Sequence, residues 1–166
     1  IEIVNLASAH KLVSTTTYAG PTTAVGAGTL NIALGSSSFS VNIVGGQNNT
    51  LAGIRDAINN ASGNEGVTAS ILTSSDGLGG TVSRLVLSSD DSGAANSITV
   101  SVTGDSDGND TNNGGLSAFL NANMEQKSSA TDAHILVDGF DVYSATNVIE
   151  DAIQGVTITA VEANPG

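Results

Sequence analysis

The sequence has no cysteine and no tryptophan, and basic residues are rare. Without cysteine there can be no disulfide bond and no thiolate metal site. Only four of the 166 residues are Lys or Arg, against 16 Asp or Glu, which gives a formal net charge of −12. So few cations cannot neutralise a phosphate backbone or an anionic lipid surface. We therefore expect neither nucleic acid nor a membrane as a partner.

Long apolar runs and a basic-then-apolar leader are also missing. The sequence thus predicts no membrane span and no cleavable signal peptide. With three Phe and two Tyr, the core must be built from Val, Ile, Leu and Ala, which suits thin sheets of β-branched residues. Short alternating strands and closely spaced turns, without a long β-α-β crossover, predict a mainly β (α+β) fold.

One short phrase occurs twice, each time ahead of a Gly-Val-Thr strand. The copies are Ile-Arg-Asp-Ala-Ile at 54–58 and Ile-Glu-Asp-Ala-Ile at 149–153. In both, the apolar residues share one face of a helix. Asn49 or Thr50 can cap the start of the first copy, and Gly155 can end the second. Both copies are therefore predicted to form short helices that pack on neighbouring antiparallel strands.

The remaining segments predict hairpins and loops. Alternating apolar residues over 30–43 indicate a hairpin, and Asp-Gly in the middle of 135–143 indicates a tight two-residue turn. The Gly, Asn and Asp residues of 104–115 predict a mobile loop, and the polar stretch 126–131 predicts a linker. Further strands are predicted at 67–73, 83–88 and 97–103.

Gly-Asp-Ser-Asp-Gly at 104–108 matches the Gly-x-Ser-x-Gly motif of serine hydrolases. That motif needs a helix after the serine and a base nearby, and the polar residues after Ser106 do not favour a helix. His10 and His134 are the available bases. Carboxylates on both sides of Ser106 would also disfavour an oxyanion. We interpret the segment as a loop and predict no catalytic residue and no cofactor site.

The segment that starts at Asp105 also resembles the beginning of a calcium-binding EF-hand loop. Such a loop needs Gly at its sixth position and a bidentate Glu at its twelfth. Here those positions are Asp110 and Leu116. Because the closing carboxylate is missing, we predict no metal site and interpret the segment as a solvated acidic loop.

The order of several phrases is more specific than any single motif. Together they resemble the head region of the bacterial flagellar filament cap family, hook-associated protein 2, and only 104–130 has no clear counterpart. The phrases that carry the resemblance lie at 4–12, 26–32, 50–61, 66–71, 84–89, 93–98, 137–139, 147–149 and 154–159.

The resemblance implies two small antiparallel β domains, one inserted into the other. It places an outer, leg-proximal domain at 1–25 and 128–166 and an inserted inner domain at 26–127. It implies a non-enzymatic part of a homo-oligomeric cap that retains flagellin and assists its folding and insertion. Such a protein is exported through the flagellum and lies outside the cell at the distal tip of the filament. No heptad repeat is present, so the family's coiled-coil legs are not expected here.

Two other functions remain open. The chain could be an adhesin-like head that binds host mucin or glycans, or an outer domain of a hook–filament junction protein or of flagellin. Few aromatic side chains are available to stack on sugars. We also expect the isolated head to be monomeric, because an acidic surface repels its own copies.

Overall fold

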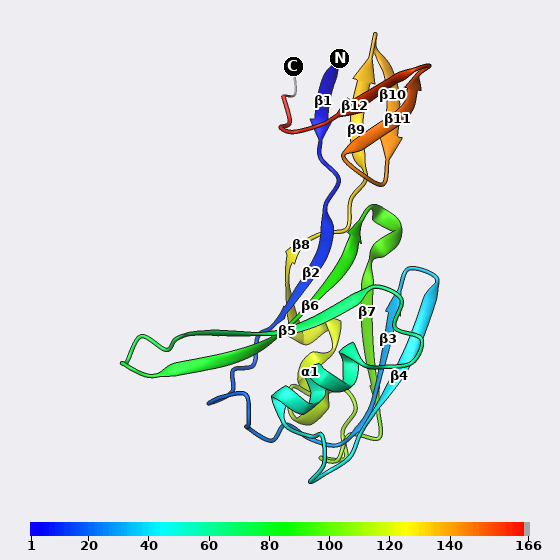
Figure 1. The fold of residues 1–166 in the computed structure, drawn as a ribbon. Coiled ribbons are helices and arrows are strands. Elements are labelled where there is room, and N and C mark those ends of the chain that lie inside the picture. The colour runs from blue at the N-terminus through cyan, green and yellow to red at the C-terminus, as the bar shows by residue number, and fades with distance from the viewer. Residues whose placement is uncertain (165–166) are drawn as a thin grey trace.

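The computed structural model describes residues 1–164, which form an elongated molecule of a larger and a smaller body (Figure 1). Every strand pair is antiparallel, so the mainly β fold is confirmed. The larger body holds a four-stranded sheet in the order β5-β6-β2-β8, a three-stranded sheet in the order β4-β3-β7, and one α-helix. Its elements are β2 (Ala9–Ser14), β3 (Gly28–Leu34), β4 (Ser37–Ile43), α1 (Leu51–Asn59), β5 (Val67–Ser75), β6 (Thr81–Ser92), β7 (Ile98–Thr103) and β8 (Met124–Ser128), with 3₁₀ helices η1 (Ala94–Asn96), η2 (Gly115–Phe119) and η3 (Asn121–Asn123).

The smaller body consists of a three-stranded sheet in the order β1-β9-β10 and a hairpin of β11 and β12. Asp138 and Gly139 both have positive φ (51° and 85°), the conformation that a type I′ turn requires. The predicted hairpin at 135–143 is therefore confirmed. The strands are β1 (Glu2–Asn5), β9 (Ala133–Val137), β10 (Phe140–Ser144), β11 (Val148–Ile153) and β12 (Val156–Thr159).

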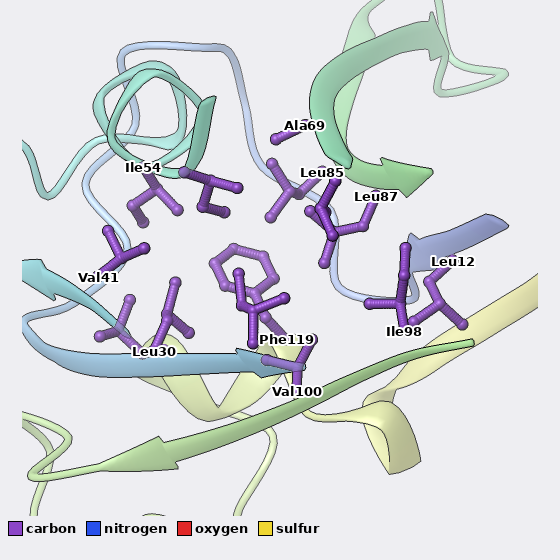
Figure 2. Packing of buried hydrophobic residues seen from close by; sticks show 14 of the residues in the cluster. Leu12, Leu30, Val41, Ile54, Ala69, Leu85, Leu87, Ile98, Val100 and Phe119 are labelled. Carbon is purple, nitrogen blue, oxygen red and sulfur yellow. The ribbon is translucent and has the colours of Figure 1, made fainter. Parts of the chain in front are cut away.

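The larger core fills the space between the two sheets and α1. Figure 2 shows Phe119 at its centre, with Leu30 and Val100 of the three-stranded sheet on one side and Ile54 of α1 on another. Each sheet contributes every second residue of its strands to this core, because residues two apart on a strand face the same side. The four-stranded sheet turns its aliphatic face inward with Leu12, Ala69, Leu85 and Leu87.

The first copy of the repeated phrase is helical, as predicted. Thr50 is the N-cap, and its Oγ1 accepts a hydrogen bond from the backbone N–H of Gly53 at 3.1 Å. Ile54 and Ile58 are fully buried. Glycine in a helix costs about 1 kcal/mol relative to alanine. Here it is needed, because a Cβ at position 53 would lie 2.6 Å from the carbonyl oxygen of Asn48.

The second copy is not a helix, so this prediction was wrong. Residues 149–153 lie in β11, where Ile149 pairs with Ile158 and Ile153 pairs with Val156. Only Gln154 and Gly155 separate β11 from β12, which leaves room for a hairpin turn and none for a helix end. Asn147, which could have capped a helix, instead bonds the backbone N–H and C=O of Ala7 through its side chain.

The predicted linker at 126–131 is also partly wrong. Residues up to Ser128 belong to β8, which pairs with β2 in the four-stranded sheet. The sequence does not indicate this strand, because Met124 is its only buried residue. The residues that follow, including Glu125 and Lys127, are polar and exposed. The predicted hairpin at 30–43 and the strands at 67–73, 83–88 and 97–103 are confirmed.

Two chain segments join the bodies and are bonded to each other. Ser8 and Thr131 exchange two backbone hydrogen bonds, at 3.0 and 3.2 Å, and their hydroxyls lie 2.7 Å apart. We call these paired segments the neck.

The predicted domain boundaries, after residues 25 and 127, stay a prediction, and the packing suggests different ones. β2 lies between β6 and β8, and Leu12 belongs to the larger core. Buried Ile135, Ile149 and Ile158 form a separate cluster in the smaller body. We infer that the chain passes between the two units near Ser8 and Thr131, at the neck.

Candidate functional site: a projecting arm and a basic sheet face

The three residues considered for serine catalysis have separate partners in the structure. Ser106 Oγ accepts a hydrogen bond from the backbone N–H of Ala27 at 3.0 Å, and its backbone N–H bonds the Ala27 carbonyl. Within residues 1–164 no hydrogen bond joins Ser106 to either imidazole. No parallel strand precedes Ser106, since β7 is antiparallel to β3. The structure thus does not bring these side chains together.

His10 is a buried connector. Its Nδ1 accepts the backbone N–H of Ile98 at 2.8 Å, so the proton lies on Nε2, which donates to Oε1 of Gln126 at 3.0 Å. The backbone N–H of His10 bonds Oγ of Ser89. β7 is the edge of its sheet, and this contact satisfies one of its backbone donors. His10 therefore ties the two sheets of the larger body together.

His134 lies in the smaller body. Its Nε2 is 2.7 Å from Oδ1 of Asp141, and its ring stacks on that of Tyr143 with centroids 4.4 Å apart. The two residues face each other across β9 and β10. Such cross-strand pairs typically stabilise a sheet.

The acidic segment 104–115, predicted to be a mobile loop, is held by its own hydrogen bonds. Oδ2 of buried Asp105 accepts from the backbone N–H and the hydroxyl of Ser117, at 2.8 and 2.9 Å. Asp110 accepts from the backbone N–H of Asp105. Bonds from Asn112 and from the backbone N–H of Asn109 lower the pKa of Asp107.

These bonds engage Asp105, Asp107 and Asp110, while Oδ1 of Asp105 is buried without a hydrogen-bond partner among residues 1–164. In the described part of the chain, no three Asp, Glu, His or Cys side chains are grouped as metal ligands. The prediction of no metal site stays a prediction. The sequence did not reveal that these carboxylates accept hydrogen bonds that hold the loop. The contact between Asp105 and Ser117 joins residues twelve positions apart, so a local pattern cannot show it.

Tyr18 lies beside this loop, and its hydroxyl is buried without a hydrogen-bond partner among residues 1–164. Burial, and then the charge on Asp105, raise the pKa of Tyr18 from its ordinary value of 10.0 to about 12. As the pH rises through this range, the unfolded chain loses a proton that the folded chain keeps. Stability that is present below pH 10 is therefore lost between about pH 10 and 12.

We expect the Tyr18→Phe variant to lose less stability than the native chain between about pH 10 and 12. At neutral pH the variant should match the native chain or exceed it by about 1 kcal/mol, because an unpartnered buried hydroxyl is removed. Urea unfolding at several pH values from neutral to alkaline measures both effects. Tyr143→Phe, at an exposed position, is the matched control. A large drop in stability at neutral pH for Tyr18→Phe would show that its hydroxyl has a favourable partner.

The most prominent surface feature is a hairpin arm. β5 and β6 continue beyond the sheet as a long two-stranded projection (Figure 1), with paired residues out to Ser75 and Thr81. The turn at its tip is 76–80, and Leu78 there is 93 % exposed. Ser75, Asp76 and Gly77 favour a turn between the two strands, but nothing in the sequence indicates that the hairpin projects.

The outer face of the four-stranded sheet carries the second surface feature. A groove of about 330 Å³ is lined by aliphatic side chains, one serine and two lysines: Val13, Ile71, Leu72, Val86, Ser70, Lys11 and Lys127. Both surface features are suited to contact with another macromolecule.

Known proteins share this architecture. A family model described as the flagellin hook IN motif matches residues 29–91. The D2–D3 domains of the flagellar cap protein FliD from Escherichia coli superpose with a TM-score of 0.81 and 32 % identity, over 99 % of this chain and 81 % of that one. FliD from Pseudomonas aeruginosa gives a TM-score of 0.75 and 35 % identity, over 97 % and 72 % of the two chains.

Full-length sequences agree. The B-type flagellar hook-associated protein 2 of Pseudomonas aeruginosa is 37 % identical, over 95 % of this chain and 34 % of its own length. The same protein of Escherichia coli K12 is 34 % identical, over 91 % and 31 %. The chain thus spans about a third of these relatives.

The fold and the hook motif place the chain among flagellar hook-associated proteins. More specifically, it belongs to the flagellar hook-associated protein 2 family, whose solved members are flagellar cap proteins. The resemblance seen in the sequence is therefore confirmed.

Proposed function

We propose that this chain is the head of a flagellar filament cap protein. In this role it lies outside the cell at the distal tip of the filament. There it retains flagellin and assists each subunit to fold and insert. It works as part of a homo-oligomer and catalyses no reaction.

The observation that supports this proposal best is the match to the FliD D2–D3 domains of Escherichia coli, at a TM-score of 0.81 over 99 % of the chain. That likeness includes both bodies, so it covers the whole described architecture. The form of the surface agrees with a mechanical role, since the chain presents a projecting arm and a sheet face. The relatives reported above are named as hook-associated or cap proteins, and none of these names supports binding to mucin or glycans.

A chimera tests the proposal. The D2–D3 region of a full-length cap protein is replaced by this chain and expressed in a strain that lacks its own cap gene. We expect long filaments by electron microscopy and little flagellin in the medium. The matched negative control is the same chimera with Phe119→Ala, which removes the centre of the head's core. Flagellin loss equal to that of the strain without a cap would contradict the proposal, provided that the chimera is exported.

A further inference from the structure

Basic side chains are concentrated on one face of a strongly acidic molecule. In the four-stranded sheet, Lys11 pairs with Ser88 and Val13 with Val86, while Leu72 pairs with Arg84. Since residues two apart on a strand share a face, Lys11 and Arg84 lie on the outer side, opposite the core. Lys127 lines the groove on that same side. Three of the chain's four cations thus gather here, on a chain of net charge −12.

Two of these cations remain available to a partner. Lys127 is paired with Glu125 at 2.6 Å. Within residues 1–164, Lys11 and Arg84 form no ion pair with a carboxylate. Arg84 donates one hydrogen bond to Oγ of Ser74, which keeps its charge. Glu125 offsets the charge of Lys127, so Lys11 and Arg84 supply the positive charge that a partner could pair with.

The groove between these cations is apolar at its base. Val13 and Val86 are opposite each other, and Leu72 is 48 % exposed. An apolar surface with a basic edge fits a ligand that combines an aliphatic side chain with a carboxylate.

The tip of the arm has that composition. Leu78 is the most exposed large apolar residue among those described. Beside it, Oδ1 of Asp76 accepts the backbone N–H groups of Leu78 and Gly80, at 2.7 and 2.9 Å. These bonds lower the pKa of Asp76, so it stays negatively charged. They also fix the shape of the turn before binding, which reduces the entropy that binding would cost.

A molecule cannot place this tip in its own groove. The arm continues β5 and β6 outward from the sheet (Figure 1), and Ser70 in the groove is five residues from the end of β5. At about 3.4 Å per residue, that is roughly 17 Å of straight strand. The occupant must come from another chain. A second copy supplies an aliphatic and an acidic group together at its arm tip.

We propose that the arm tip of one copy docks in the basic groove of a second copy, with Leu78 on the apolar base and Asp76 facing Lys11. This inference rests on the proposed function, because it needs a homo-oligomeric cap. Tip and groove are different surfaces, so each contact leaves one of each free for the next copy, the arrangement from which rings form. The contact area is small, which keeps the contact weak and agrees with a monomeric isolated head.

Disulfide trapping tests this contact directly, because the chain has no cysteine of its own. The single variants Leu78→Cys and Ser70→Cys are mixed at about 1 mM, where even a contact with a Kd near 1 mM is substantially populated. The matched control pairs Leu78→Cys with Ser36→Cys, another exposed serine, in the turn between β3 and β4. Thermal unfolding of each variant checks that it is folded.

We expect the 78–70 pair to crosslink on the order of tenfold faster than the 78–36 pair, since docking raises the effective concentration of the two thiols. Lys11→Glu in the groove partner, and added salt, should each reduce this advantage. Equal rates for the two pairs would overturn the inference. Flagellin retention by the chimera would be unaffected by that result, so the two proposals can fail separately.

Discussion

Replacing Phe119 with alanine should lower the free energy of unfolding by about 3–5 kcal/mol. The ring is fully buried at the centre of the larger core (Figure 2), and it contacts Tyr18 with ring centroids 6.1 Å apart. Its removal leaves a cavity between two sheets that are themselves fixed by backbone pairing, so the site can collapse only in part. The free energy of unfolding of a domain is typically about 5–15 kcal/mol, so this loss would be a large share of it. Urea unfolding followed by circular dichroism measures it.

Phe140→Ala is the matched control, because Phe140 is 76 % exposed in the smaller body. At this exposed position the same substitution should change the free energy of unfolding by no more than about 0.5 kcal/mol. If the two variants lose similar stability, the assignment of Phe119 to the centre of the core is wrong.

Ile54→Ala and Ile149→Ala compare the two copies of the repeated phrase. Ile54 is fully buried in α1 against the larger core, and its truncation should cost about 2–5 kcal/mol. Ile149 is 5 % exposed in the cluster of the smaller body. We expect Ile149→Ala to destabilise the smaller body and to leave the larger core intact.

Hydrogen exchange measured by mass spectrometry separates the two effects. Ile54→Ala should speed exchange in β3 to β7, and Ile149→Ala in β9 to β12. Faster exchange throughout the chain for both variants would mean that the bodies unfold as one unit, which would also contradict the inferred boundary at the neck.

Local patterns predicted most strands and turns, and the errors have a common cause. The two copies of the phrase are nearly identical, yet only the first is a helix. Thr50 caps that helix locally, whereas Asn147 bonds Ala7, 140 residues away in sequence. Only two residues separate Ile153 from β12, and pairing of β11 with β12 then makes the second copy a strand. Tertiary contacts of this kind cannot be read from a short window.

The same limit applies to the surface. Ser75, Asp76 and Gly77 predict a turn, but whether the hairpin lies flat or projects depends on how far β2 pairs along β6. β2 pairs with β6 from Val13 to Ala9, and β5 continues beyond it to Ser75. The cations at Lys11 and Arg84 are 73 positions apart, so only the register of β2 and β6 brings them to one face.

The neck at Ser8 and Thr131 decides how the head responds to load. Two hydrogen-bonded segments resist twisting more than a single linker would, and Ser92 Oγ in β6 also donates a hydrogen bond to the carbonyl oxygen of Ala145 in the smaller body at 2.7 Å. A load on the smaller body is therefore passed to the larger one through several hydrogen bonds rather than through a single covalent linker.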